Sequence, residues 1–289
     1  MEKNIKLYRG DCLEVMDKLI KKGVVVDLTV TSPPYDNLRT YNNSSSWNED
    51  IWKQVIEKLY RVTKDSGVVV WVVGDATIKG SETGTSFKQA LYFKEVGFNL
   101  HDTMIYQKSK FSPYDPRNKR YKQQFEYMFI FSKGKPRSYN AINDVKNKYA
   151  GLKFKGRHGR TNKDDIRKPN EHYKILAEFQ DRSNIWKYAQ EGNKSEHPAP
   201  FPEKLANDHI ISWSNEGDTV LDPMCGSGTT CKMAKLNNRN YIGIDCSEEY
   251  CNIAKERINK LNSEEVKTCA TKHVIPPKSK DSGILPNFT

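Results

Sequence analysis

Hydrophobic positions along the chain fall into two patterns, short β-branched runs and longer stretches with apolar residues at helical spacing. Val24–Val30 and Val68–Val73 are runs of the first kind, which are typical of strands buried in a parallel sheet. Between them, apolar residues recur at helical spacing from Ile51 to Val62, which predicts an amphipathic helix ahead of a turn at Asp65–Gly67. The pattern therefore indicates strands that alternate with helices.

The same two patterns continue along the rest of the chain. Further strands are expected at Asn4–Tyr8, Met104–Gln107, Tyr127–Phe131, Thr219–Leu221 and Tyr241–Ile244, and regular structure is expected to resume at Asn184–Trp186. Further helices are expected at Leu13–Lys21, Lys88–Val96, Pro202–Trp213 and Thr229–Leu236, with a last one capped by Ser247. This alternation predicts an α/β protein with a doubly wound, mostly parallel sheet, which binds ligands beyond the carboxyl ends of its strands.

Composition narrows the class of protein. The chain has 289 residues, 36% of them hydrophobic, and a mean hydropathy of −0.79. No apolar run approaches the roughly 18–20 residues of a membrane span, and no signal-peptide core follows Met1, so we expect a cytoplasmic protein with no membrane partner. None of the six cysteines forms a Cys-x2-Cys pair, so we expect no zinc site, no disulfides and no other metal.

The net charge of +11 is concentrated in one stretch of the chain. Residues 133–174 hold thirteen Lys or Arg against four Asp or Glu, a net charge of +9. They also show no periodicity after Gly134 and contain several aromatic residues. A localised basic excess is expected where a protein meets a phosphate backbone, although a merely solubilising face would have the same charge.

A glycine-containing loop directly follows the strand that ends at Leu221. Its residues are Asp222, Pro223, Met224, Cys225, Gly226, Ser227, Gly228, Thr229 and Thr230. Glycines permit a tight turn and a close approach of the backbone to a ligand, and the next helix offers free N–H groups. The third glycine of a dinucleotide fingerprint is missing and no Gly-Lys-Thr follows, so the loop alone is also compatible with an ordinary turn.

An acidic residue, Asp245, ends the next strand, 17 positions after Gly228. A carboxylate at about this distance from a glycine loop is suited to ribose hydroxyls, which favours an adenosine-containing cofactor.

The third strand-end motif is Thr31-Ser32-Pro33-Pro34-Tyr35, directly after Val24–Val30. The two prolines stiffen the backbone and remove two N–H donors, which leaves a segment rich in hydrogen-bond acceptors. Acceptors suit a substrate amino group, and Tyr35 offers a face for a planar base. An ordinary proline-terminated strand is the alternative.

Together these motifs resemble the amino-group DNA methyltransferases, and in their order the β class, whose motifs are permuted. In that family an SPPY-type catalytic tetrapeptide comes first, a target-recognition region follows, and the cofactor loop comes near the C-terminus. Here Ser32–Tyr35, the basic stretch, the segment His197–Pro202 and the glycine loop occur in that order. The resemblance covers nearly all of the chain outside residues 134–183 and the tail.

The resemblance implies a circularly permuted, Rossmann-like fold with S-adenosylmethionine as cofactor. It implies that the glycine loop, Asp245 and the segment with His197, Pro198 and Phe201 bind this cofactor. Because the chain ends soon after the helix that follows Asp245, the permutation implies that the strand at Asn4–Tyr8 lies beside the Asp245 strand. Asp11 and Cys12 would then line the adenine pocket, although a helix cap is the alternative for Asp11.

The resemblance also implies methylation of double-stranded DNA by flipping of the target base, with Ser32, Pro33, Pro34 and Tyr35 as the catalytic residues. Family members with Ser at the first position usually modify cytosine N4, and those with Asp or Asn adenine N6. Adenine N6 methylation stays open as an alternative. A nicotinamide-dependent oxidoreductase would leave Ser32–Tyr35 unexplained, and a non-catalytic nucleic-acid-binding protein would leave both pocket motifs unexplained.

The expected organisation is a catalytic half at residues 1–133, a target-recognition insert at 134–183, a cofactor-binding half at 184–262 and a tail at 263–289. The residues expected to bind DNA are Lys153, Lys155, Arg157, Arg160 and Lys163. The Asn- and Ser-rich loop at residues 36–50, with Trp47, is a candidate to close over the flipped base. A separately encoded restriction endonuclease is a potential partner, and both a monomer and a homodimer stay open.

Overall fold

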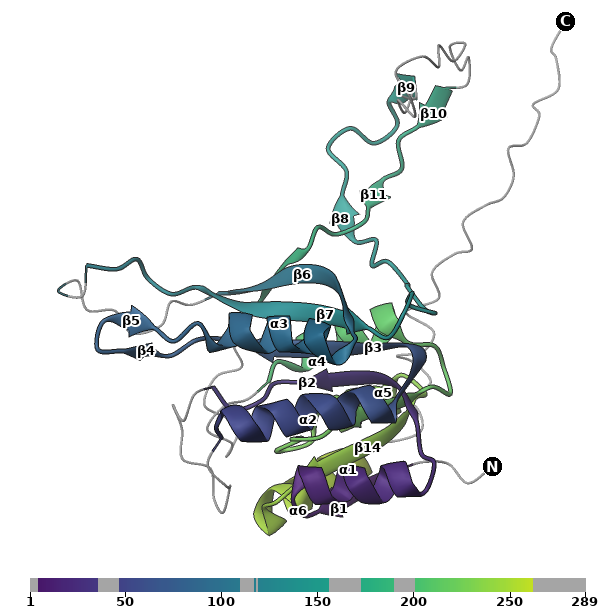
Figure 1. Ribbon diagram of the computed structural model, residues 1–289. Helices are drawn as coiled ribbons and strands as arrows, with labels where there is room; N and C mark the ends of the chain where they lie inside the picture. The colour runs from purple at the N-terminus through teal and green to yellow at the C-terminus, as the bar shows by residue number, and fades with distance from the viewer. Residues whose placement is uncertain are drawn as a thin grey trace, which may run out of the picture.

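A computed structural model describes residues 5–35, 47–109, 117, 119–155, 173–189 and 201–261. Its centre is an eight-stranded sheet in the order β1-β14-β13-β2-β3-β7-β6-β12 (Figure 1). The strands are β1 (Ile5–Arg9), β2 (Val26–Thr31), β3 (Thr63–Val73), β6 (Asn99–Lys108), β7 (Phe125–Ser132), β12 (Ile185–Tyr188), β13 (Thr219–Asp222) and β14 (Asn240–Asp245). The helices are α1 (Cys12–Lys21), α2 (Glu49–Val62), α3 (Thr85–Val96), α4 (Glu203–Trp213), α5 (Thr229–Leu236) and α6 (Glu248–Asn259).

The sheet is mostly parallel, as the sequence predicts. The five strands from β1 to β3 run parallel to one another, β7 is antiparallel to both of its neighbours, and β12 is parallel to β6. The N-terminal strand β1 pairs with β14, with Arg9 opposite Asp245, which confirms the expected place of the first strand.

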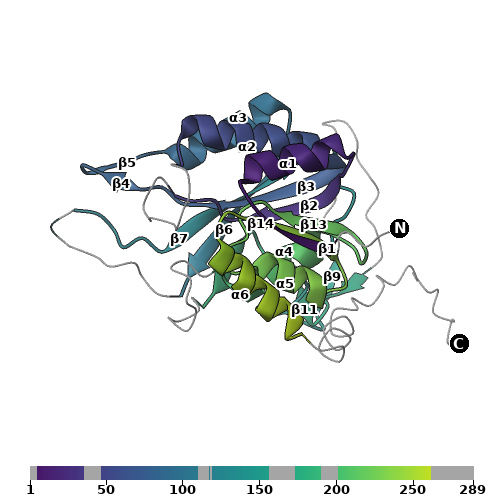
Figure 2. The same ribbon diagram turned by 90° about the horizontal axis from the view of Figure 1, so that it is seen from below.

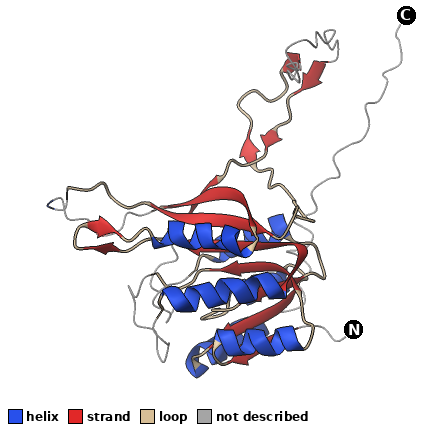
Figure 3. Cartoon of the chain, viewed as in Figure 1, coloured by secondary structure: helices blue, strands red, loops and turns tan. Residues whose placement is uncertain are grey.

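Helices cover both faces of the sheet, which gives three layers (Figures 2 and 3). Helices α1, α2 and α3 lie on one face, and α4, α5 and α6 on the other. The β-branched strand β3 shows how one run serves both layers, because successive side chains of a strand point to opposite faces. Val68, Val70 and Val72 belong to the core on the α4–α6 side, whereas Val69 and Trp71 belong to the core on the α1–α3 side.

The expected turn at Asp65–Gly67 is wrong, because β3 already begins at Thr63 and runs through these residues. Ser66 takes a left-handed conformation with φ 65°, and its N–H donates to the carbonyl of Lys133 at 2.6 Å. The N–H of Lys133 in turn donates to the carbonyl of Gly67 at 3.0 Å. Pairing with the chain beyond β7 therefore keeps this irregular segment inside the sheet.

Two structures project from the three layers (Figure 1). The first, which we call the projecting segment, is residues 144–182, of which 144–155 and 173–182 are described. It contains two antiparallel strand pairs, β8 (Val145–Lys146) with β11 (Phe179–Gln180) and β9 (Lys153–Lys155) with β10 (Tyr173–Ile175).

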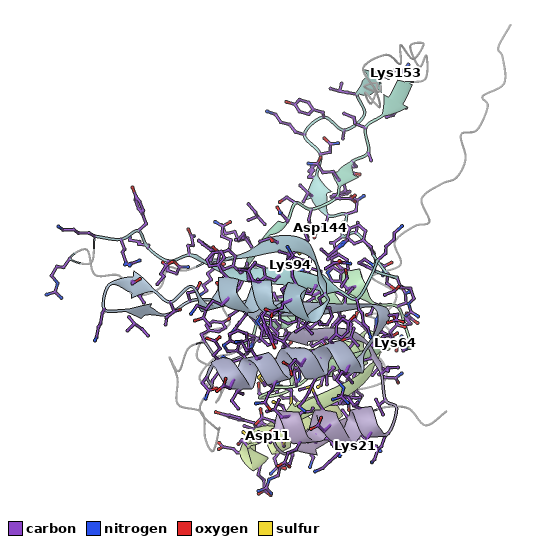
Figure 4. All side chains as sticks on the ribbon, in the orientation of Figure 1. Asp11, Lys21, Lys64, Lys94, Asp144 and Lys153 are labelled. Carbon is purple, nitrogen blue, oxygen red and sulfur yellow. The ribbon has the colours of Figure 1, made fainter. Side chains whose placement is uncertain are left out.

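The base of the projecting segment is fixed to the body by Arg182. Its guanidinium donates to Asp144 at 2.7 Å and to Asp208 of α4 at 2.6 Å. Figure 4 shows Asp144 near the body and Lys153 at the far end of the projection. The segment is thus held at its root by an ion-pair bridge to a buried carboxylate.

The second projection is the hairpin of β4 (Thr77–Ile78) and β5 (Ser81–Glu82), beside the chain that enters β7 (Figure 1). No helix within the described ranges is long and apolar enough to cross a membrane.

Candidate active site

The three strand-end motifs meet at one edge of the sheet, as the sequence predicts. Strand β13 lies between β2 and β14, and all three are parallel, so their carboxyl ends point the same way. The segment Ser32–Tyr35 follows β2, the loop Asp222–Thr230 leaves β13, and Asp245 ends β14. We call the ends of β13 and β14 the cofactor edge.

The glycine loop is held in shape by its neighbours. The N–H of Cys225 donates to the carbonyl of Ile244 at 2.9 Å, and the N–H of Gly226 donates to the Asp245 carboxylate at 2.9 Å. Gly228 has φ +77°, and a Cβ atom added to it would lie 2.6 Å from the Cβ of Ala254 on α6. Only glycine satisfies both the left-handed backbone and this close approach of α6.

Asp245 organises the cofactor edge through backbone groups. One carboxylate oxygen accepts from Gly226, and the other accepts from the N–H of Ser247 at 2.8 Å. Ser247 itself caps α6, because its hydroxyl accepts from the N–H of Tyr250. Asp245 therefore fixes the loop and the start of α6 relative to each other.

Asp222 joins the cofactor edge to the strand that carries the SPPY segment. The hydroxyl of Thr31 donates to its carboxylate at 2.8 Å, and the N–H of Met224 donates to the same oxygen at 3.2 Å. Asp222 is buried, and burial raises its pKa to about 6 against the opposing hydrogen bond from Thr31. The hydroxyl of Thr230, in the first turn of α5, donates to the carbonyl of Val30 at 3.2 Å, so the start of α5 is joined to β2 as well.

Tyr35 is part of a chain of side-chain contacts that the sequence did not reveal. Its hydroxyl lies 3.0 Å from the hydroxyl of Ser32 and donates to Glu126 at 2.9 Å. The other carboxylate oxygen of Glu126 lies 2.5 Å from the ammonium of Lys108. We call these four residues the catalytic corner. Lys108 ends β6 and Glu126 lies in β7, so the antiparallel strands bring this pair to the SPPY segment.

Asp11 is a helix cap in the structure. One oxygen of its carboxylate accepts from the N–H of Leu13 at 2.8 Å and from that of Glu14 at 3.3 Å. The N–H of Gly10 donates to the carbonyl of Asp245 at 2.9 Å, which brings Asp11 and Cys12 close to the cofactor edge. Burial, reinforced by Asp11, raises the pKa of the Cys12 thiol to about 12, so this side chain stays neutral.

Sequence analysis also did not reveal a partly buried ion-pair group behind the glycine loop. Arg257 of α6 donates to the carbonyl and the hydroxyl of Ser227, each at 2.7 Å, and to Glu203 of α4 at 2.7 Å. Lys232 of α5 contacts the same carboxylate at 2.6 Å. Burial opposes ionisation of Glu203, but the hydrogen bonds from Lys232 and Arg257 keep its pKa below the usual value. The group clamps the loop to both helices.

Some expected site residues do not contribute to this geometry. Phe201 is partly buried and packs against the core on the α4–α6 side. Of the loop at residues 36–50, the candidate to close over the base, residues 36–46 with Tyr41 lie outside the described residues, and Trp47 is buried in the core on the α1–α3 side at 8% exposure. Lys153 is exposed in the projecting segment, and Lys155 lies in β9. The residues His197, Pro198, Arg157, Arg160 and Lys163 lie outside the described residues.

The site residues that sequence analysis missed, Glu126 and Arg257 among them, do not stand out in the sequence. Glu126 is an acid near the start of an otherwise apolar strand, FEYMFIFS, and Arg257 is one of several charges on α6. No sequence pattern tells which partner such a charge meets. Among the described residues, no group of three or more His, Cys, Asp or Glu side chains could hold a metal ion.

The sheet order and the strand-end site define a Rossmann-like α/β fold. Two solved structures share the fold. The PvuII DNA methyltransferase, described as cytosine-N4-specific, superimposes with a TM-score of 0.63 at 20% identity, over 93% of this chain and 92% of that one. The complex of M1.HpyAVI with SAM has a TM-score of 0.57 at 24% identity, over 88% of this chain and 99% of that one.

Sequence comparisons identify the family. The DNA methylase family of the N6/N4 type matches residues 26–256. The orphan methyltransferase M.BamHII of Bacillus amyloliquefaciens is 58% identical over 244 residues, which are 81% of this chain and 88% of the relative. The chain therefore belongs to the N6/N4 family of DNA methylases.

Proposed function

We propose that this protein transfers a methyl group from S-adenosylmethionine to the N4 amino group of cytosine in double-stranded DNA. The observation that carries the proposal is the hydrogen bond that connects the SPPY segment to the glycine loop. The hydroxyl of Thr31, next to Ser32, donates to Asp222 at the root of the glycine loop. A base held at Ser32 and a cofactor held by the loop would thus share one rigid strand end, and such positioning is the main requirement of a direct transfer.

The cofactor is S-adenosylmethionine, and the residues at the cofactor edge fit it. S-adenosylmethionine supplies an electrophilic methyl group on a sulfonium. Asp245, half-buried at the end of β14, is placed for the ribose hydroxyls, and Asp222 supplies a carboxylate beneath the loop. Gly226 and Gly228 allow the backbone to lie close to a ligand. Cys12, neutral and partly buried beside Asp11, suits the adenine ring.

The order of the motifs supports the permuted β class. The SPPY segment comes first in the chain, the cofactor loop comes last, and the N-terminal strand β1 lies beside β14. In this arrangement the N-terminal strand β1 is the edge strand of the sheet, next to the strand that ends at Asp245.

The catalytic segment supplies acceptors to an amino group. The exocyclic nitrogen of a base is a weak nucleophile because its lone pair is delocalised into the ring. The base is flipped out of the duplex, and Ser32 and the carbonyl of Pro33 accept hydrogen bonds from its amino group. Tyr35 stacks on the base and helps to offset the positive charge that develops at nitrogen.

Ser32 is the residue that favours cytosine over adenine. The resemblance assigns Ser at this position to N4 modification and Asp or Asn to N6 modification. Adenine N6 is the second candidate, because both bases present an amino group with two N–H donors.

The projecting segment is the target-recognition region in this proposal, and it divides the methyltransferase domain into a catalytic half and a cofactor-binding half. Lys146, Lys148 and Lys153 are exposed along it, and Tyr149 is 56% exposed. Cations and aromatic rings are suited to phosphates and bases. The relative M.BamHII is called an orphan methyltransferase. The proposed methyl transfer requires neither a restriction endonuclease partner nor a particular oligomeric state.

The experiment is to methylate duplex DNA with labelled S-adenosylmethionine, digest it to nucleosides and identify the labelled one. We expect N4-methylcytosine with the wild type. The Ser32→Ala and Tyr35→Ala variants should lose about 100-fold or more in rate, as removal of a key transition-state contact does. Label in N6-methyladenine would reverse the choice of base. Wild-type rates in both variants would remove the catalytic assignment.

A further inference from the structure

The catalytic corner fixes the direction of the hydrogen bond between Tyr35 and Ser32. Glu126 is held by the ammonium of Lys108 at 2.5 Å and accepts from Tyr35 at 2.9 Å. A phenol has one hydrogen, and in this chain Tyr35 gives it to Glu126. The contact of 3.0 Å between the hydroxyls of Ser32 and Tyr35 therefore has Ser32 as its donor.

This direction has a chemical consequence at Ser32. A serine hydroxyl has one hydrogen and two lone pairs. With its hydrogen directed to Tyr35, Ser32 can only accept from any further group. A substrate amino group brings N–H donors. The Ser32 hydroxyl is then already oriented to accept a hydrogen bond from one of them.

We propose that Glu126 and Lys108 are positioning residues, which act through the Tyr35 hydroxyl to hold Ser32 as a pure hydrogen-bond acceptor. The proposal rests on the methyltransferase function above. The side chains of Lys108 and Glu126 are only 13% and 15% exposed, so water competes little for their contact. Gly74 closes the corner, because a Cβ atom there would lie 3.6 Å from both the Tyr35 ring and the Glu126 side chain.

The test is a double-mutant cycle between Glu126→Gln and Tyr35→Phe, with single-turnover methylation at saturating DNA and S-adenosylmethionine. Glu126→Gln in the wild-type background should lower the rate about 10- to 100-fold, the scale of a small misplacement of a reacting group. In the Tyr35→Phe background the same change should cost less than about twofold, because the hydroxyl through which it acts is gone. Cofactor affinity by calorimetry should stay within about twofold throughout.

Tyr92 and Glu57 provide a matched control, because the Tyr92 hydroxyl donates to Glu57 at 2.5 Å on the surface of α2 and α3. Tyr92→Phe and Glu57→Gln should leave the rate unchanged. If Glu126→Gln costs as much in the Tyr35→Phe background as in the wild type, the positioning role is wrong. A wild-type protein that binds DNA but transfers no methyl group would overturn the proposed function instead, before any variant is compared.

A second, independent observation concerns the projection next to the catalytic corner. The hairpin β4–β5 leaves β3 just after Gly74, and residues 119–124 lead into β7 just before Glu126. Arg120 joins them, because its guanidinium donates to the carbonyl of Gly80 and contacts Glu82 at 3.4 Å. In Figures 1 and 2 both strips project on the same side of the molecule. We call residues 77–82 and 119–124 the basic arm.

The basic arm presents cations at unusual positions. It contains Lys79, Lys119, Arg120 and Lys122 against one acid, Glu82. Lys79 has φ 47° and Lys119 φ 49°, left-handed conformations that normally favour Gly, Asn or Asp. The turn Lys79–Gly80 is thus a hairpin turn in which a charged residue stands where Asn is preferred. A cation kept at a strained position points to a use for its charge.

We infer that the basic arm binds the DNA backbone beside the flipped base. Lys122 is four residues from Glu126, so it lies at most about 14 Å away along an extended chain. A DNA strand advances about 3.4 Å per nucleotide, so the arm can reach phosphates within about four nucleotides of a base held at Tyr35. The ring of Tyr121 is fully exposed among these cations and is available to the same strand.

The test compares the triple variant Lys79→Gln, Lys119→Gln and Lys122→Gln with a control of equal charge change. The control is Lys21→Gln, Lys22→Gln and Lys94→Gln, three exposed lysines at the end of α1, directly after it and in α3. Figure 4 shows Lys21 and Lys94 away from the arm. We measure DNA affinity from 50 to about 300 mM salt. The arm variant should lower the slope of log affinity against log salt by about 2 to 3, and the control by less than about 1. Equal slopes in the two variants would rule out the arm as a DNA contact, and wild-type methylation of the same duplex separates that result from a failure of the proposed function.

Discussion

The cofactor edge and the catalytic corner are made of different kinds of contact. At the cofactor edge, carboxylates bind backbone amides at most 19 positions away: Asp222 binds Met224, and Asp245 binds Ser247 and Gly226, at separations of 2, 2 and 19 positions. In the catalytic corner, side chains meet side chains from distant strands, and Tyr35 and Glu126 are 91 positions apart. The cofactor edge is thus defined by local backbone geometry and the corner by the packing of the sheet.

This difference predicts different failures. Changes at the cofactor edge should alter folding stability and cofactor affinity together, because the same bonds shape the loop. Changes at Ser32 and Tyr35 in the catalytic corner should reduce the rate of methyl transfer and leave stability nearly intact.

The largest expected effect is that of Gly228→Ala. The new side chain needs a left-handed backbone and a place 2.6 Å from the Cβ of Ala254. Strain of about 1 kcal/mol and overpacking of about 1–3 kcal/mol should together lower the free energy of unfolding by about 2–4 kcal/mol. Urea unfolding measures this loss, and calorimetry should show weaker binding of S-adenosylmethionine.

Gly23→Ala is the matched control. Gly23 has φ +69° and nothing within 4 Å of an added Cβ atom, so it carries the strain without the clash. It should cost only about 1 kcal/mol. Equal losses in the two variants would show that α6 moves aside, and the loop would then be less rigid than its bonds indicate.

The next effect is a pH dependence at Asp222. Burial raises its pKa from 3.8 to about 6 in the folded protein. Stabilisation from the neutral acid is therefore complete below about pH 4 and lost as the pH rises through 6, by up to about 3 kcal/mol. In urea unfolding, Asp222→Asn should gain on the wild type between pH 4 and 7, because the amide never ionises and its oxygen can still accept from Thr31.

A constant difference between Asp222→Asn and the wild type across this range would mean that Asp222 titrates normally. The cofactor edge would then be more hydrated than the burial of Asp222 indicates.

The cofactor edge could be predicted from the sequence because its determinants are local. β-branched runs locate the strands, and Asp222, Asp245 and Ser32 directly follow them. The catalytic corner could be predicted only at Ser32 and Tyr35, because the partners of Tyr35 depend on which strands are neighbours. Strand β7 lies antiparallel between β3 and β6, and the hydrophobic pattern of the sequence does not predict this strand order.

The same limit applies to Arg257. It reads in sequence as a surface charge on a polar helix, yet it donates to Ser227 in the loop and to Glu203 on another helix. Ion pairs of this kind follow from the three-dimensional arrangement of α4, α5 and α6.

The bond between Thr31 and Asp222 is where the two regions meet, across 191 positions of sequence. Thr31→Val keeps the shape and removes the donor to a buried carboxylate, which should cost about 1.5–3 kcal/mol of stability if Asp222 stays charged. Measured at pH 4.5 the loss should be smaller, because the acid is then mostly neutral. We also expect a lower rate of methyl transfer. A stable Thr31→Val protein with the wild-type rate would show that the two regions work independently.

The smallest expected effect separates two roles for Asp11. In the structure its carboxylate caps α1 through Leu13 and Glu14. Asp11→Ala should therefore cost about 1 kcal/mol of unfolding free energy, the usual value of a lost cap, whereas Asp11→Asn should cost little because Asn caps equally well. Calorimetry with S-adenosylmethionine decides whether the residue does more. If Asp11 only fixes the start of α1, Asp11→Asn binds the cofactor like the wild type. If the carboxylate itself contacts the adenine amino group, the loss of its charge weakens binding although the cap is intact, and α1 then belongs to the cofactor edge by chemistry as well as by position.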